Sequence, residues 1–232
     1  MPPRNQLLTL LPRAELEKIS PDLEPVTLAL RQVLHEPDEK IAYVYFVTSG
    51  VISIVNEPDA GEIVECATIG PEGMAGFPLA LGTSTIPSRA IVQIPGEALR
   101  MSSADFQRAF DRLPRFRALL LRYIMALLNQ IAQVTSCNRL HEVQERCARW
   151  LLQTHDRVLS DSFPLTHEFL SQMLGVHRPT VTVAAGILQK AGLVEYSRGT
   201  ITILDRKGLE AASCNCYRLI AAEYERLLTS KE

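Results

Sequence analysis

The stretch from Phe163 to Leu204 constrains the fold most, because helical spacing of apolar residues gives way to strand-like alternation within it. Thr166 supplies the side-chain oxygen of a helix N-cap, and Glu168 places negative charge in the first turn. Gly175 permits the positive φ of a tight turn. The inward faces on either side of it are Phe169, Leu170, Met173 and Leu174, and then Val176, Val181, Ala184 and Leu188. The pattern predicts two short helices joined at one glycine.

The second of these helices carries polar residues on its outer face, close to its start. They are His177, Arg178, Thr180 and Thr182, with Pro179 in the first turn, where a missing N–H is tolerated. After Gly192 the runs LVEY and TITIL flank SRGT, which predicts a β-hairpin with Arg198 at its tip. We therefore predict a winged helix-turn-helix whose second helix contacts base edges and whose wing cation contacts phosphate.

The charge is divided unevenly along the chain. The net charge is -2, but residues 1 to 112 carry 9 Lys and Arg against 15 Asp and Glu, whereas residues 113 to 232 carry 15 against 11. Because DNA affinity comes largely from phosphate neutralisation, the basic half is the expected docking side, with chance clustering as the alternative. We find no signal peptide and no run of 18 apolar residues, so we expect a soluble cytoplasmic protein that makes no membrane contact.

Short β-like runs punctuated by glycine occupy the region from Val26 to about Met101. Their regular spacing predicts an antiparallel roll or barrel. Together with the amphipathic entry at residues 5 to 20, this gives a sensor domain over 1–112. The predicted fold class is α+β, with an antiparallel β-roll first and helices after it.

The segment 113–138 is expected to be one long dimerisation helix. Apolar residues recur in it at spacings of 4, 3, 4 and 3, which is the seam of a two-stranded coiled coil: Leu120, Ile124, Leu127, Ile131 and Val134. Other apolar residues widen this surface: Ala118, Leu121, Met125 and Leu128. The stripe can therefore face a second copy of the chain, its own β-roll, or both. Residues 139–232 complete the DNA-binding domain, with a terminal helix expected to pack on it.

An acidic roll, a long helix and a winged helix-turn-helix, in that order, resemble the Crp/Fnr family of bacterial transcription regulators. The most specific motifs are FVTSGVISI, IGPEGMAGF with SRAIVQ, and the helix-turn-helix itself. The resemblance implies that Arg178 contacts a base and that Thr166 and Thr180 contact phosphate, with a nonspecific phosphate contact as the alternative for Arg178. Pro179 and Val183 depart from the family's usual reading residues, which implies a different operator.

The effector positions also depart from the cyclic-nucleotide-binding members. Phe77 follows Gly76 where those members carry glutamate, and Arg89 follows Ser88 one position later than their phosphate-binding arginine. A shift of one residue in a strand turns the side chain to the other face, so cyclic AMP is disfavoured. The candidate pocket residues are Gly73, Gly76, Phe77, Ser88, Arg89, Thr135 and Ser136. Either another ligand binds there or the chain's own side chains fill the space.

No cofactor is expected, and the effector is unknown. Cys214 and Cys216 form a C-x-C pair, but two thiolates give only half of a tetrahedral zinc shell, so no metal site is predicted. The five cysteines form no disulfide framework. We find no catalytic residue set and expect no enzyme. The expected function is a homodimeric regulator that binds palindromic double-stranded DNA, with a metal- or redox-responsive repressor as the alternative; RNA polymerase and a small-molecule effector are left open as partners.

Overall fold

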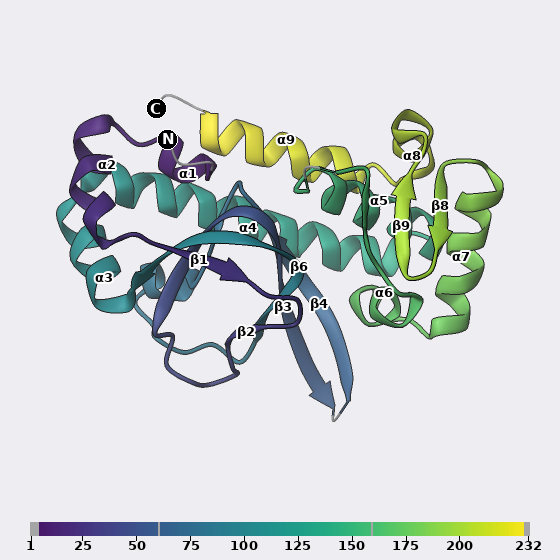
Figure 1. Ribbon diagram of the computed structural model, residues 1–232, viewed down its shortest axis with the longest axis horizontal. Helices are drawn as coiled ribbons and strands as arrows, with labels where there is room; N and C mark the ends of the chain where they lie inside the picture. The colour runs from purple at the N-terminus through teal and green to yellow at the C-terminus, as the bar shows by residue number, and fades with distance from the viewer. Residues whose placement is uncertain (1–4, 60, 159, 230–232) are drawn as a thin grey trace. The chain divides into compact units, whose positions relative to one another are not determined.

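The computed structural model describes residues 5–59, 61–158 and 160–229, which form two compact units (Figure 1). The first unit comprises the described residues up to Ile54, Thr68–Leu128, and those from Glu223 onward. The second comprises Val55–Ala67 and Asn129–Ala222. The long central helix is thus shared between both units instead of forming a segment by itself. The residue boundaries predicted from the sequence stay predictions.

An antiparallel sheet forms the core of the first unit. Its strands are β1 (Glu24–Leu28), β2 (Val33–His35), β3 (Tyr43–Asp59), β4 (Glu62–Ile69), β5 (Met74–Ala75) and β6 (Arg89–Ser102). The order is β1-β6-β3-β4, with β2 on β6 and β5 on β3, which confirms the predicted roll. Gly50 has φ +84°, and a Cβ there would lie 2.6 Å from the Ile94 carbonyl oxygen. Only glycine allows β3 and β6 to approach so closely.

Short helices complete this unit: α1 (Gln6–Thr9), α2 (Arg13–Ile19), the 3-10 helices η1 (Ser20–Asp22) and η2 (Phe77–Leu81), and α3 (Ser103–Arg112). Asn5 caps α1 and also anchors it, because its side-chain amide donates to the carbonyls of Val47 and Gly73, both at 2.8 Å. The rings of Phe106 and Phe116 pack edge to face with centroids 5.9 Å apart. The amphipathic entry therefore packs on the roll.

Helix α4 (Pro114–Leu140) buries part of the predicted dimer seam within its own chain. Leu120, Ile124 and Leu127 are at most 3% exposed and lie in the core of their own chain, so they are not available to a partner. Ile131 and Val134 are half-buried. The large exposed apolar residues of this helix within the same unit are Leu121, Met125 and Leu128, at 45%, 46% and 49% exposure. Spacing alone predicted a stripe correctly but could not tell which of two parallel stripes faces inward.

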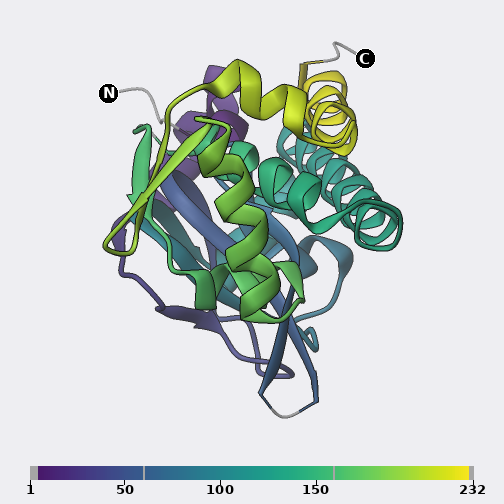
Figure 2. The same ribbon diagram turned by 90° about the vertical axis from the view of Figure 1, so that its right-hand side faces the viewer.

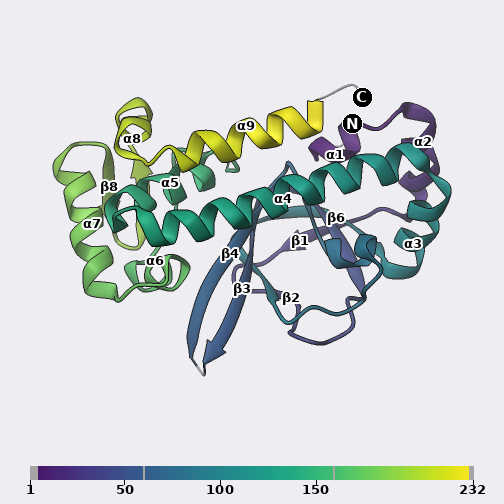
Figure 3. The same ribbon diagram turned by 180° about the vertical axis from the view of Figure 1, so that it is seen from behind.

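Figure 3 shows α4 as one uninterrupted helix. Within the part of the chain that the structure describes, it is the one helix long and apolar enough to cross a membrane by length and composition alone. Within the apolar 18-residue window of this helix, 44% of the residues are buried inside the protein. The helix contains no uninterrupted run of 18 apolar residues, so this finding does not contradict the expectation from the sequence.

The second unit contains α5 (Val143–His155), β7 (Ser162–Pro164), α6 (His167–Leu174), α7 (Arg178–Lys190), β8 (Val194–Ser197), β9 (Thr200–Ile203), α8 (Arg206–Ala212) and the start of α9 (Cys216–Thr229). The wing gains a third strand that was not predicted, in the order β7-β9-β8, with Phe163 opposite Ile201. The terminal helix packs on this unit only in part. From Glu223 onward it belongs to the first unit, where the rings of Tyr224 and Tyr123 lie 6.5 Å apart.

Candidate DNA-binding site

The turn between α6 and α7 has the geometry that the sequence predicts. The Thr166 hydroxyl accepts the Phe169 backbone N–H at 3.1 Å, which caps α6. Gly175 ends that helix in the left-handed region at φ 61°. A Cβ on Gly175 would lie 3.1 Å from a methyl group of Val64, which belongs to the same unit, so space as well as backbone conformation favours glycine. The two helices are thereby fixed against each other.

Helix α7 presents an exposed, positively polarised start. His177 occupies its N-cap without a side-chain capping bond, and no acidic residue lies in the first turn. The free N–H groups and the helix dipole therefore favour an anion there. The exposed residues at this end are His177, Arg178, Pro179, Thr180, Thr182 and Val183, while the inward face is Val181, Ala184, Ala185 and Leu188. Figure 2 shows α7 beside the wing.

Thr182 is exposed, but its hydroxyl is engaged within the protein. It donates to the Arg178 carbonyl at 3.1 Å and lies 3.1 Å from Nδ1 of His167. Burial, and then the charge of Arg178, lower the pKa of His167, so the ring is neutral and can donate this hydrogen bond. The ring also packs edge to face on Tyr196, with centroids 4.7 Å apart. His167 is thus a neighbour of Thr182 that the sequence did not indicate, since only folding brings the two side chains together.

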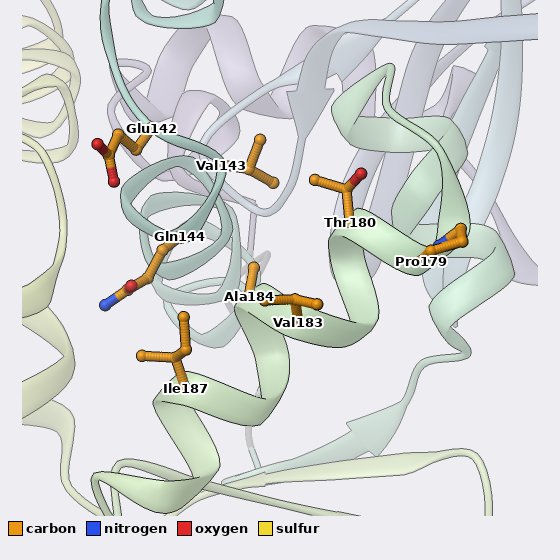
Figure 4. Close-up of a pocket in the computed structure, with 8 residues that line it drawn as sticks. All are labelled: Glu142, Val143, Gln144, Pro179, Thr180, Val183, Ala184 and Ile187. Atoms are coloured by element: carbon orange, nitrogen blue, oxygen red, sulfur yellow. The ribbon is translucent and has the colours of Figure 1, made fainter.

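A shallow groove of about 440 Å³ runs between the start of α5 and the outer face of α7 (Figure 4). Glu142, Val143 and Gln144 line one side, and Pro179, Thr180, Val183, Ala184 and Ile187 the other. Val183 is 64% exposed and Ile187 42%. Exposed apolar groups beside polar reading residues suit contact with a thymine methyl group.

The tip of the wing carries Arg198 in an unusual backbone conformation. Arg198 has φ 49° and the following Gly199 has φ 78°. Two successive positive φ values define a type I′ turn, in which arginine is a poor choice compared with asparagine or glycine. The side chain is exposed. The tip of the wing therefore presents a cation, although the turn conformation is unfavourable for arginine.

The predicted effector residues are engaged in contacts within the protein. Arg89 forms an ion pair with Glu36, with Nε and Oε2 2.6 Å apart, and Phe77 and Ser88 are buried at 7% and 8% exposure. Gly76, at φ +90°, is the N-cap of η2, and a Cβ on Gly73 would collide with the ring of Tyr123. The two hydroxyls on α4 donate to their own helix: Thr135 to Ile131 at 2.9 Å and Ser136 to Ala132 at 3.2 Å.

Two domain families match the sequence. Residues 25–112 match the cyclic nucleotide-binding domain and residues 145–212 the Crp-like helix-turn-helix domain. A sensory roll followed by a DNA-reading head defines a one-component transcription regulator. The chain belongs to the Crp/Fnr family of transcription regulators.

Solved structures share this fold at low sequence identity. A putative transcriptional regulator of the Crp/Fnr family from Eubacterium rectale has 19% identity and a TM-score of 0.68, covering 87% of this chain and 94% of its own. FixK2 from Bradyrhizobium japonicum has 17% identity and a TM-score of 0.70, covering 83% and 98%. The c-di-GMP-responsive global regulator CLP from Xanthomonas campestris has 19% identity and a TM-score of 0.65, covering 83% and 99%. Comparison with curated protein sequences gives no significant match.

Proposed function

We propose that the chain is a homodimeric, sequence-specific regulator that binds a palindromic DNA site through α7. The observation that carries the proposal is the exposed, acid-free start of α7, where Arg178 stands with no ion pair to any described residue. Members of this family are transcription regulators and not enzymes, and they are soluble cytoplasmic proteins. We propose that this chain, too, is a cytoplasmic protein without enzymatic activity.

The DNA contacts that we propose follow from which side chains of α7 are exposed and which are already hydrogen-bonded within the protein. The Arg178 guanidinium reaches outward and can pair with O6 and N7 of a guanine. Thr180 and His177 are exposed beside it and are proposed to contact phosphate, together with Thr166 at the start of α6. Val183 offers a methyl contact to thymine. Thr182 is assigned to supporting Arg178, because its hydroxyl already donates to the Arg178 carbonyl.

Dimerisation is assigned to the exposed stripe of α4. Leu121, Met125 and Leu128 are spaced by 4 and 3, the repeat of a coiled-coil seam, and each has close to half of its surface exposed. A symmetric pair of α4 helices would present two α7 helices to half-sites about 34 Å apart. The stripe replaces the seam predicted from spacing alone.

The sensor is proposed to bind a ligand other than cyclic AMP. The Arg89 guanidinium pairs with Glu36, and Phe77 is buried where a carboxylate would accept the ribose hydroxyl in cyclic-nucleotide-binding members. Thermal-shift measurements with cyclic AMP and with cyclic di-GMP test this directly. We expect no saturable shift with cyclic AMP, and a clear one would overturn the pocket assignment.

Within the second unit, a hydrogen bond connects β4 to α5, and α5 in turn packs against α7. The indole N–H of Trp150 on α5 donates to the Glu65 carboxylate on β4 at 2.9 Å, and both residues are buried. Movement of β4 would therefore act on α5, which packs closely against α7.

Selection of binding sites from random DNA, followed by titration at moderate salt, tests the proposed function. We expect one enriched palindrome with guanine at a fixed position in each half. Binding without sequence preference would refute it.

A further inference from the structure

Four potential metal ligands from two distant segments converge in the second unit. Cys137 and His141 lie one helical turn apart at the end of α4, and Cys214 and Cys216 flank the turn into α9. The His141 N–H still bonds the Cys137 carbonyl at 3.1 Å, so both side chains leave the same side of the helix. Cys137 and Cys214 are separated by 77 positions in the sequence. The structure thus supplies the second half of a shell whose first half is the C-x-C pair.

The distances fit a single tetrahedral ion. The four ligand atoms all lie within 4.8 Å of one another. The sulfurs of Cys137 and Cys214 are 3.4 Å apart, and the Cys216 sulfur is 3.5 Å from Nδ1 of His141. With Zn–S bonds of about 2.3 Å, tetrahedral geometry requires sulfurs separated by about 3.8 Å. The two close pairs lie within about 0.4 Å of the separation that zinc requires, and the widest pair exceeds it by about 1 Å or less, so a small contraction would complete the shell.

Two buried guanidinium groups near the cluster favour a negatively charged centre. Arg149 and Arg146 on α5 are 3% and 7% exposed, and both lie within electrostatic range of the Cys137 sulfur. Neither guanidinium forms an ion pair with a carboxylate among the described residues. Three thiolates, a neutral imidazole and Zn²⁺ carry one net negative charge. Such a centre would offset buried cations that are otherwise costly.

Outer groups also hold the ligands in place. The Gln133 side-chain amide donates to the Cys216 sulfur at 3.1 Å. Hydrogen bonds of this kind orient thiolates at structural metal sites. Cys137, Cys214 and Cys216 are at most 4% exposed, whereas His141 is half-buried and leaves a path for entry.

We propose that Cys137, His141, Cys214 and Cys216 bind one zinc ion. Three thiolates and one imidazole form one of the standard sets for structural zinc, and soft thiolates exclude magnesium and calcium. Binding releases the thiol protons to solvent and involves no oxidation. The close approach of the four atoms suits one ion, because an iron-sulfur cluster spreads its ligands over several irons. The ion would join the end of α4 to the start of α9.

This proposal departs from the expectation of no metal site, and it does not rest on the proposed DNA binding. The test is metal analysis of the full chain, purified with a reductant and without a chelator. We expect one zinc per chain, and visible absorption bands of a tetrahedral thiolate site after replacement by Co²⁺. Cys66→Ser is the matched control, because Cys66 is a half-buried thiol outside the cluster.

Two substitutions at the half-buried ligand separate coordination from packing. His141→Ala should weaken zinc binding by on the order of 100-fold or more, measured by competition with a chromophoric chelator. His141→Cys should restore tight binding, because four thiolates also form a zinc site. Circular dichroism verifies that each variant is folded.

Three results would overturn the proposal. They are a reduced protein that takes up no zinc, zinc binding that His141→Ala leaves unchanged, and acid-labile sulfide in the purified protein. A disulfide between Cys137 and Cys214 that persists in reductant and excludes zinc would also replace the metal site with a redox site.

Discussion

Replacing Arg178 with alanine tests most directly whether α7 contacts the bases of DNA. Arg178 is the first residue of α7, is exposed, and makes no ion pair with a described residue, so its loss removes no side-chain contact that stabilises the fold. Alanine is at least as good a helix former, and removal of a cation from a helix N-terminus is slightly favourable, by about 0.3–1 kcal/mol. The melting temperature should therefore be unchanged or slightly raised, and any loss of DNA affinity belongs to the interface.

The expected loss follows from the symmetry of the complex. A bidentate arginine-guanine contact contributes about 1–3 kcal/mol of discrimination. A palindrome contains two such contacts, so Arg178→Ala should cost about 2–6 kcal/mol, or about 30-fold to about 20,000-fold in affinity. Fluorescence anisotropy with the selected operator, and with operators carrying each base at the assigned position, measures both the loss and its base dependence.

Arg178→Lys is the matched control because it keeps the charge and removes the planar fork. It should retain the salt dependence of binding while losing preference for guanine. If Arg178→Ala instead weakens binding to all sequences equally and only lowers the salt slope, the side chain contacts phosphate and the base-reading assignment is wrong.

Three further predictions concern the wing, the dimer and the sensor. Asparagine suits the left-handed turn at φ 49° better than arginine does, so Arg198→Asn should not lower the melting temperature. The same substitution should reduce the slope of log affinity against log salt by about 1.8, because a dimer has two wings. Met125→Glu places charge in the exposed stripe of α4 and should convert dimer to monomer in analytical ultracentrifugation. Burial lowers the pKa of His35 against the opposing effects of the Ser88 carbonyl and Glu36. The unfolded chain therefore binds more protons, and the free energy of unfolding, measured with urea, should fall as pH drops from about 7 to about 5.

Each of these has a paired control. Arg198→Lys should keep the salt slope, and a slope unchanged in Arg198→Asn contradicts phosphate contact by the wing. Leu30→Glu changes an equally exposed leucine in another part of the chain and should leave the dimer intact. A Met125→Glu protein that remains dimeric would place the interface elsewhere. His35→Gln should flatten the pH dependence of stability, and an unchanged profile would assign that dependence to other groups.

Local signals explain why most of the fold was predictable. The turn at Gly175, the cap at Thr166 and the type I′ hairpin at Arg198 and Gly199 depend on residues close in sequence, and each was placed correctly. Strand β7 was missed because its three residues, the last of which is Pro164, carry almost no periodicity, and only pairing with β9 makes them a strand.

Features that depend on contacts between distant parts of the chain could not be predicted from the sequence. Two apolar stripes on α4 have the same spacing, and only packing against the roll determines that Leu120 is buried and Leu121 exposed. Cys137 and Cys214 lie 77 positions apart, and the tertiary fold alone brings them together. A C-x-x-x-H spacing at the end of a predicted helix was the available hint, and it gains meaning only beside the C-x-C pair.

The bond between Thr182 and His167 also limits how operator preference can change during evolution. Thr182 holds the first turn of α7 through the Arg178 carbonyl and lies against His167. A substitution at either position would disturb the other and the backbone that carries Arg178. Divergence among related regulators should therefore run through positions 179, 180 and 183, which can vary one at a time, while 167 and 182 should change as a pair.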